Sequence, residues 1–142
     1  MFLEEYETDR YLIARLDHDS DIIESITQLA KDNDVEAGVF TAIGALKRAT
    51  LEFYDQDEHE YGKTVIDEPR ELASCMGNIS ILEGDPFPHT HAVLASEDGD
   101  AIAGHLSSGV VFATEVHLQV LDGSELVRTH EDPTDLSMWG SQ

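Results

Sequence analysis

PFPHTHAVLASEDGDAIAGHL, residues 86–106, contains two apolar segments on either side of a short acidic turn with one glycine. The first segment begins with His89 and His91, and the second ends with His105. Such a pattern is typical of a β-hairpin. Because successive side chains alternate across a strand, His89 and His91 must project from the same face.

The length of the turn decides where the third histidine points. A three-residue loop at 97–99 places His91 directly opposite His105, so that three imidazoles converge. A two-residue loop at Asp98-Gly99 would shift the pairing by one residue and turn His105 to the other face. Both registers are compatible with the sequence, and the chemistry of the histidines favours the first.

Three clustered histidines predict a metal site. Without a metal they would only lower one another's pKa, whereas three neutral imidazoles with an open fourth position are a common zinc arrangement. We therefore predict that His89, His91 and His105 bind zinc or another divalent transition metal. The alternative is a set of polar side chains that hydrogen-bond to backbone or water.

The rest of the chain is predicted to be mostly β-structure. Segments rich in β-branched and aromatic residues are separated by Gly, Asp and Pro. These segments are 11–17, 39–43, 49–55, 60–65, 71–82, 89–96, 101–106, 110–121 and 125–129. No helical crossovers separate the strands after residue 38, so they should pair mostly antiparallel.

One strong helix is expected after the first strand. Asp21 suits the N-cap position, Ile22 and Ile26 recur at helical spacing, and the pattern stops at Asn33-Asp34. The expected fold is α+β: a curved, mostly antiparallel sheet or partial barrel with one main helix. Residues 1–142 should form a single domain with a core of about residues 11–128.

The charge is strongly acidic. The 142 residues include 30 Asp plus Glu against 8 Lys plus Arg, a formal net charge of −22. The acidic residues are scattered rather than clustered, which favours a solvated coat in a cytoplasmic protein of a salt-loving organism over a patch made for a basic partner. No secretory signal and no membrane span is expected.

The other candidate groups are weaker. Cys75, the single cysteine, is expected in the core. Glu97 and Glu115 are possible general bases or outer-shell partners of a metal. His18, His59, His117 and His130 are expected at the surface. The segment 132–142 should dock its apolar side chains on the body of the protein or on a neighbouring subunit.

Four motifs, in order and spacing, resemble the plants-and-prokaryotes-conserved (PPC) domain family. They are GVFTAIGAL at 38–46, MGNIS at 76–80, PFPHTH at 86–91, and AGHL at 103–106 followed by Glu115-Val116. The resemblance covers about residues 11–128. It implies a homotrimer whose zinc is held near a subunit boundary by residues matching His89, His91 and His105, and it carries a DNA-binding label.

Direct DNA binding is electrostatically disfavoured. No Arg-Gly-Arg-Pro hook of the plant relatives is present, and Lys47-Arg48 is the sole adjacent basic pair. We therefore expect a trimeric, metal-binding regulatory or DNA-associated interaction module, with a protein or small-molecule partner that the sequence does not identify. The alternatives are a direct DNA-binding protein and a zinc-dependent enzyme that uses the three histidines.

Overall fold

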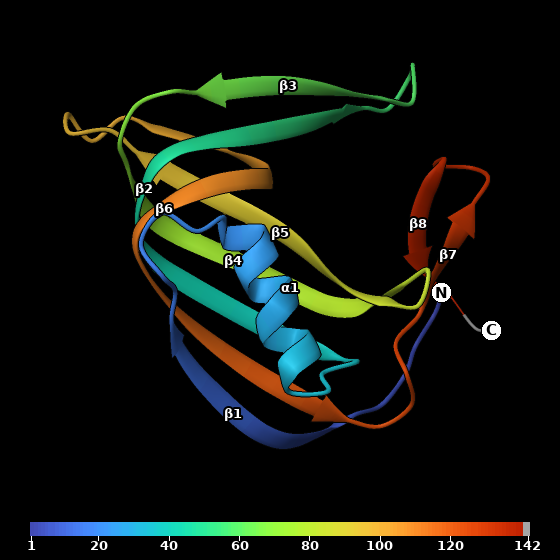
Figure 1. Cartoon of the computed structure of the whole chain (residues 1–142). Coiled ribbons are helices and arrows are strands. Elements are labelled where there is room, and N and C mark those ends of the chain that lie inside the picture. Colours follow the sequence, from blue (N-terminus) through green and yellow to red (C-terminus); the bar gives the residue numbers. More distant parts are fainter. Residues whose placement is uncertain (141–142) are drawn as a thin grey trace.

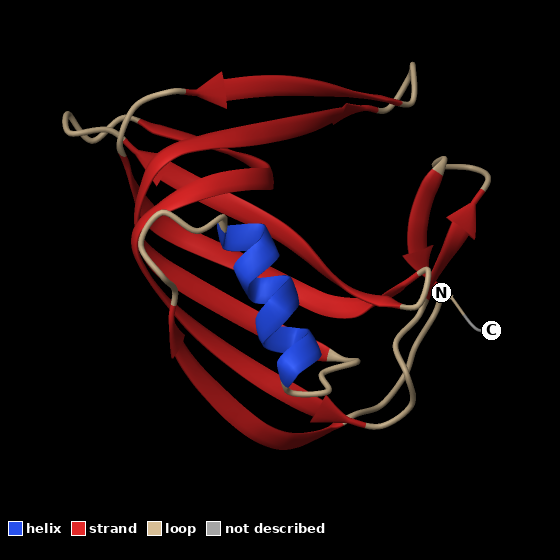
Figure 2. Cartoon of the chain, in the orientation of Figure 1, coloured by secondary structure: helices blue, strands red, loops and turns tan. Residues whose placement is uncertain are grey.

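The computed structural model describes residues 1–140 as a strongly curved sheet with one helix on its concave side (Figures 1 and 2). The elements are β1 (Glu7–Arg15), α1 (Ile22–Asp32), β2 (Gly38–Asp55), β3 (Glu60–Ile66), β4 (Arg70–Leu82), β5 (Asp85–Ala95), β6 (Ala101–Asp122), β7 (Arg128–Glu131) and β8 (Leu136–Trp139). The prediction of a mostly antiparallel curved sheet with one main helix is confirmed.

The sheet closes on itself. Its strand order is β1-β6-β5-β4-β2-β3, and an additional β2–β6 pairing joins strands that are not neighbours in that order. Strands β2, β4, β5 and β6 therefore form a ring, with β1 and β3 on its outer edges. Every pairing between these strands is antiparallel. Closure leaves few free edges and explains the partial barrel.

Two strands are longer than the sequence predicted. Segments 39–43 and 49–55 are one strand, β2, and segments 101–106 and 110–121 are one strand, β6. Register shifts in their pairing bend these strands around the barrel instead of ending them. Gly44 lies at one bulge with φ of 146°, where a Cβ atom would lie 2.1 Å from the carbonyl oxygen of Ala113. Glycine there permits the bend.

Helix α1 begins and ends where the sequence predicted. The Asp21 side chain accepts hydrogen bonds from the backbone N–H groups of Ile23 and Glu24, and its second oxygen accepts one from Gly109 on β6. One carboxylate thus caps the helix and ties it to the barrel. No helix within residues 1–140 is long and apolar enough to cross a bilayer.

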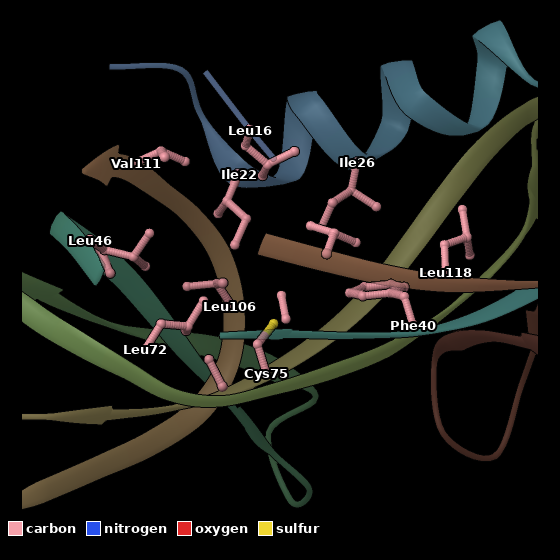
Figure 3. Close-up of a cluster of buried hydrophobic side chains, with 14 of the residues drawn as sticks. Leu16, Ile22, Ile26, Phe40, Leu46, Leu72, Cys75, Leu106, Val111 and Leu118 are labelled. Carbon is pink, nitrogen blue, oxygen red and sulfur yellow. The ribbon is translucent and has the colours of Figure 1, made fainter. Parts of the chain in front are cut away.

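The core lies between α1 and the inner side of the barrel (Figure 3). Ile22 and Ile26 of the helix are fully buried against it, as are Leu106 and Leu118 of β6. Cys75 also belongs to this core, as expected, and burial raises the pKa of its thiol to about 12. The thiol is therefore unreactive.

Arg128 joins the C-terminal hairpin β7–β8 to the sheet. Its Nε donates to Ser80 Oγ at 2.8 Å, Nη2 to Asn78 Oδ1 at 2.9 Å and Nη1 to the Ser137 carbonyl at 2.9 Å. The guanidinium also lies 5.3 Å from the centre of the Phe87 ring. Burial lowers the pKa of Arg128, and its charge is stabilised by neutral hydrogen-bond acceptors and aromatic faces.

The strand expected at 125–129 is displaced to Arg128–Glu131, because it pairs with β8 rather than with the main sheet. The C-terminal segment contacts the body at Thr134, whose carbonyl accepts a hydrogen bond from the Tyr54 hydroxyl, whereas Trp139 lies against Arg128 of its own hairpin at 5.7 Å. Residues 141 and 142 of that segment lie outside the described residues.

Arg128→Leu should lower the free energy of unfolding by about 3 kcal/mol, because it leaves one buried and two part-buried acceptors without their charged donor. Urea unfolding at fixed high salt measures this change. Arg48→Leu is the matched control, since Arg48 is exposed, and it should stay within about 0.5 kcal/mol of the wild type. Equal losses in the two variants would contradict a structural role for Arg128.

Candidate metal centre

The β5–β6 hairpin has the register that brings the histidines together. Ser96 and Asp100 close the turn through hydrogen bonds from Ser96 N to the Asp100 carbonyl at 2.8 Å and from Asp100 N to Ser96 Oγ at 3.1 Å. Gly99 takes a positive φ of 86° in the three-residue loop. His91 therefore lies directly opposite His105, and the predicted register is confirmed.

The three imidazoles converge. The ring centroids of His89, His91 and His105 are 5.2 to 5.7 Å apart, and one ring nitrogen from each lies within 4.8 Å of the others. In a tetrahedral zinc site such nitrogens are about 3.3 Å apart, given bonds of about 2.0–2.1 Å. Small rotations of the side chains would bring the three ring nitrogens to that separation.

Strand β4 holds the histidine strand from the other side. Asn78 is the cross-strand partner of His89, and Met76 is the partner of His91. Between them, a Cβ atom on Gly77 would lie 2.4 Å from the His89 carbonyl oxygen and 2.4 Å from the Phe40 ring. Glycine at position 77 thus lets β5 pack close to the core. This close packing sets the position of His89 relative to β4.

The electrostatics favour the neutral forms of His89 and His105. Desolvation first, then the positive charge of Arg128 and the two neighbouring imidazoles, together lower the pKa of His89 to about 4. Desolvation and then His91 lower the pKa of His105, while Glu52 acts in the opposite direction. At neutral pH the rings of His89 and His105 therefore carry the lone pairs that a metal requires.

No hydrogen bond within residues 1–140 uses a ring nitrogen of His89, His91 or His105. Among the other histidines, by contrast, His18 Nδ1 lies 2.8 Å from the Phe112 carbonyl oxygen. Within this part of the chain, backbone groups therefore do not hydrogen-bond to the nitrogens of the three rings. The donor set, three imidazole nitrogens that converge, fits a divalent transition metal.

Two cavities flank the cluster, and both include His89 and His91 in their walls. One, of about 650 Å³, lies over the convex side of the sheet and is lined also by Tyr11, Met76, His117 and Trp139. The other, of about 660 Å³, includes His105, Glu52, Tyr54 and Tyr61; we call it the β3-side cavity. A metal at the cluster would be accessible from both.

The carboxylates that the sequence suggested do not lie in these cavities. Glu97 is exposed at the hairpin turn and Glu115 is exposed beside Arg15 and Ile43, and neither lines the walls beside the histidines. His18, His59, His117 and His130 are exposed, as expected. His117 lines the convex-side cavity and His59 the β3-side cavity, yet neither joins the cluster of three.

Glu52 is the carboxylate that the structure places beside the cluster. It pairs with His105 across β2 and β6, so His91, His105 and Glu52 form one row on adjacent strands. Its side chain is 12% exposed and lies 3.2 Å from Lys63 Nζ. Sequence reasoning missed Glu52 because the pairing that brings it to the site spans 53 positions.

Tyr61 and Arg128 were also missed. The ring of Tyr61 is tilted against that of His105, with 6.0 Å between the centroids, and desolvation followed by the Glu52 charge raises the pKa of the Tyr61 hydroxyl. Arg128 reaches the cluster through Asn78, the partner of His89. A lone arginine near the end of an acidic chain was the only signal for it.

Residues 3–122 match the model of the family described as the Plants and Prokaryotes Conserved (PCC) domain. The structure is similar to that of the metal-containing protein AF0104 of Archaeoglobus fulgidus, with 35% identity, a TM-score of 0.96, and 99% of this chain and 100% of that chain covered. It is also similar to a plant- and prokaryote-conserved (PPC) protein of Pyrococcus horikoshii, with 28% identity, a TM-score of 0.94, and 100% and 99% covered.

More distant similarities show the fold. A Bacteroides thetaiotaomicron protein, provisionally described as DNA-binding, is 22% identical with a TM-score of 0.86 over 95% of this chain and 96% of that one. The bifunctional protein GlmU of a Synechococcus strain is 28% identical over 112 residues, which are 78% of this chain. The chain spans only 16% of the length of that relative.

The metal-free protein should lose stability as the pH falls from about 6.5 to about 4. The pKa of His89 is about 4 in the folded chain and near 6.5 when exposed, so the unfolded state binds more protons across this interval. His89→Gln should lose less of its free energy of unfolding over this pH interval, when unfolding is followed at several pH values with chelator present. His117→Gln, which alters an exposed ring, should match the wild type, and identical slopes in all three proteins would contradict the shift.

Proposed function

The chain belongs to the Plants and Prokaryotes Conserved (PCC) domain family, and from that premise we propose that it is a trimeric, cytoplasmic metal-binding interaction module with zinc held by His89, His91 and His105. The observation that carries the proposal is the convergence of three ring nitrogens within 4.8 Å. The metal-containing description of the Archaeoglobus protein supports it. A bound zinc ion would supply a fixed joint between β5 and β6 and an open Lewis-acid position.

An uncharged outer face supports self-association. Cross-strand pairing sets seven uncharged side chains of β1, β6, β2 and β4 side by side on the convex side of the sheet, with Arg15 and Glu115 at their border. This outer face consists of Tyr11, Ile13, Val39, Thr41, Met76, His117 and Gln119. Tyr11, Ile13 and Met76 are each at least 60% exposed. In a chain with 27% charged residues, such an area is typical of a contact surface.

A second copy of the chain is the occupant that the charges favour. Two chains of net charge −22 repel each other wherever acidic surfaces meet, and the outer face offers an approach without such a meeting. His91 continues the row of Ile13, His117 and Met76, so the metal site lies at the rim of this face. Assembly and metal binding would therefore support each other.

Direct DNA binding is the weaker candidate, although two similar structures carry that description. Five of the eight basic residues form ion pairs with carboxylates of this chain: Arg10, Lys31, Lys47, Lys63 and Arg70. Arg128 is buried. Lys47, half of the adjacent basic pair, contacts Asp19 at 2.5 Å. Few cations remain to displace counterions from a phosphate backbone.

Purified protein should contain about one zinc per chain, and His89→Ala should lose it. Removal of a direct ligand should weaken binding by more than the roughly 10–100-fold typical of outer-shell changes. Elemental analysis gives the stoichiometry, and a chelator should lower the melting temperature of the wild type but not of the variant. His130→Ala, which alters an exposed histidine outside both the cluster and the outer face, should keep its metal. Loss of metal in both variants, or in neither, would contradict the assignment.

Ile13→Glu should dissociate the assembly, because it adds a negative charge to the exposed row of Ile13, His117 and Met76 on the uncharged outer face. Light scattering in molar salt should show the mass falling from three times to once the 15.7 kDa of the chain. Val65→Glu is the matched control, since Val65 is 70% exposed on β3, away from that face. A wild-type protein that is monomeric under these conditions would overturn the trimer.

A further inference from the structure

The β3-side cavity has the features of a binding site for a small molecule. It is built from three separate parts of the chain: the histidine hairpin, the β2–β3 hairpin and the turn between β7 and β8. The Tyr54 hydroxyl donates to the Thr134 carbonyl at 2.7 Å and so ties the β7–β8 turn to the β2–β3 hairpin. The volume of the cavity, about 660 Å³, lies within the range of sites for organic ligands.

Aromatic rings form one wall of this cavity. The Tyr54 and Tyr61 ring centroids are 4.8 Å apart at an interplanar angle of 56°, and Tyr61 lies 6.0 Å from the ring of His105. His59 stacks on the other side of Tyr54 at 6.1 Å. A flat apolar group that entered the cavity would meet these rings within reach of the three histidine nitrogens.

The charge around the cluster is positive once the site is loaded. Three neutral imidazoles leave the charge of a divalent ion unbalanced, and Arg128, hydrogen-bonded to neutral groups, adds a second cation behind His89. Within residues 1–140, none of the ion pairs involves Arg128. Glu52 is the one acidic side chain in the cavity wall, and Lys63 lies 3.2 Å from it.

This local excess of positive charge stands out in a chain with a net charge of −22. A cation would be repelled from the loaded site, and a neutral ligand would leave the charge unbalanced in a half-buried position. A monoanion with an oxygen donor satisfies both requirements, since it completes the coordination and reduces the charge. A second negative charge on the ligand would be repelled by the carboxylate of Glu52.

We propose that the β3-side cavity binds a small organic monocarboxylate, with its carboxylate at the open coordination position and its planar carbon body against Tyr54 and Tyr61. The inference rests on the proposed metal site and adds the chemical class of ligand that this site takes. Glu52 then acts as a specificity-determining residue that disfavours dicarboxylates. Tyr61 supplies the preference for a planar body over a short aliphatic one.

Cobalt(II)-loaded protein tests the proposal through its visible absorption, which reports directly on the ligands of the ion. Cobalt stoichiometry is measured first, so failure to load counts against the metal site, whereas failure of the spectrum to respond counts against the ligand. Benzoate should change the spectrum saturably and bind several-fold more tightly than acetate. Benzamide, its neutral counterpart, should produce no change at the same concentrations.

Two variants of the loaded protein complete the test. Tyr61→Leu should weaken benzoate to the level of acetate and leave acetate unchanged, while Val65→Ala on the same strand should behave as the wild type. Glu52→Gln should tighten phthalate, a dicarboxylate, more than benzoate. A loaded protein whose spectrum is unmoved by benzoate, or that responds equally to benzamide, would overturn the proposal. Equal effects of the Tyr61 and Val65 changes would overturn the aromatic wall.

Discussion

The register of the β5–β6 hairpin is the constraint on which the rest of the site depends. Because side chains alternate along a strand, a shift of one residue between these strands would remove His105 from the face that carries His89 and His91. The three-residue loop at 97–99 prevents the shift, since Ser96 and Asp100 close it with backbone and side-chain hydrogen bonds and Gly99 accepts the positive φ that the loop needs. A few local contacts therefore determine whether the chain presents a metal site at all.

The closure of the barrel converts that local arrangement into a site with walls. His105 pairs with His91 on one side and with Glu52 on the other, so one row of side chains crosses three strands. This row exists because β6 is long enough to reach β5 at one end and to follow β2 along most of its length. The bulges that bend β2 and β6 are thus as necessary to the site as the histidines themselves.

The local features of this structure could be predicted from the sequence, and the contacts between residues far apart in the chain could not. The hairpin, its turn and the helix cap at Asp21 follow from patterns within about twenty residues, and the structure has each of them. The continuity of β2 and β6 was missed because polar and glycine residues at bulges read as strand ends. Glu52 and Arg128 were missed because pairings and contacts across some 50 positions bring them to the site, and no short pattern encodes such contacts.

The acidic composition takes on a different meaning once the fold is known. A chain with 30 acidic residues leaves the outer face without acidic charge and places one carboxylate, Glu52, in the wall of the β3-side cavity beside the three histidines. Few of the 30 acidic side chains therefore lie at these two areas, although acidic residues are scattered along the whole sequence. Like charges keep the acidic surface solvated, and areas with few of them are where contact with another molecule costs the least electrostatic energy. Both areas adjoin the same three imidazoles, so assembly and ligand binding would meet at one metal centre.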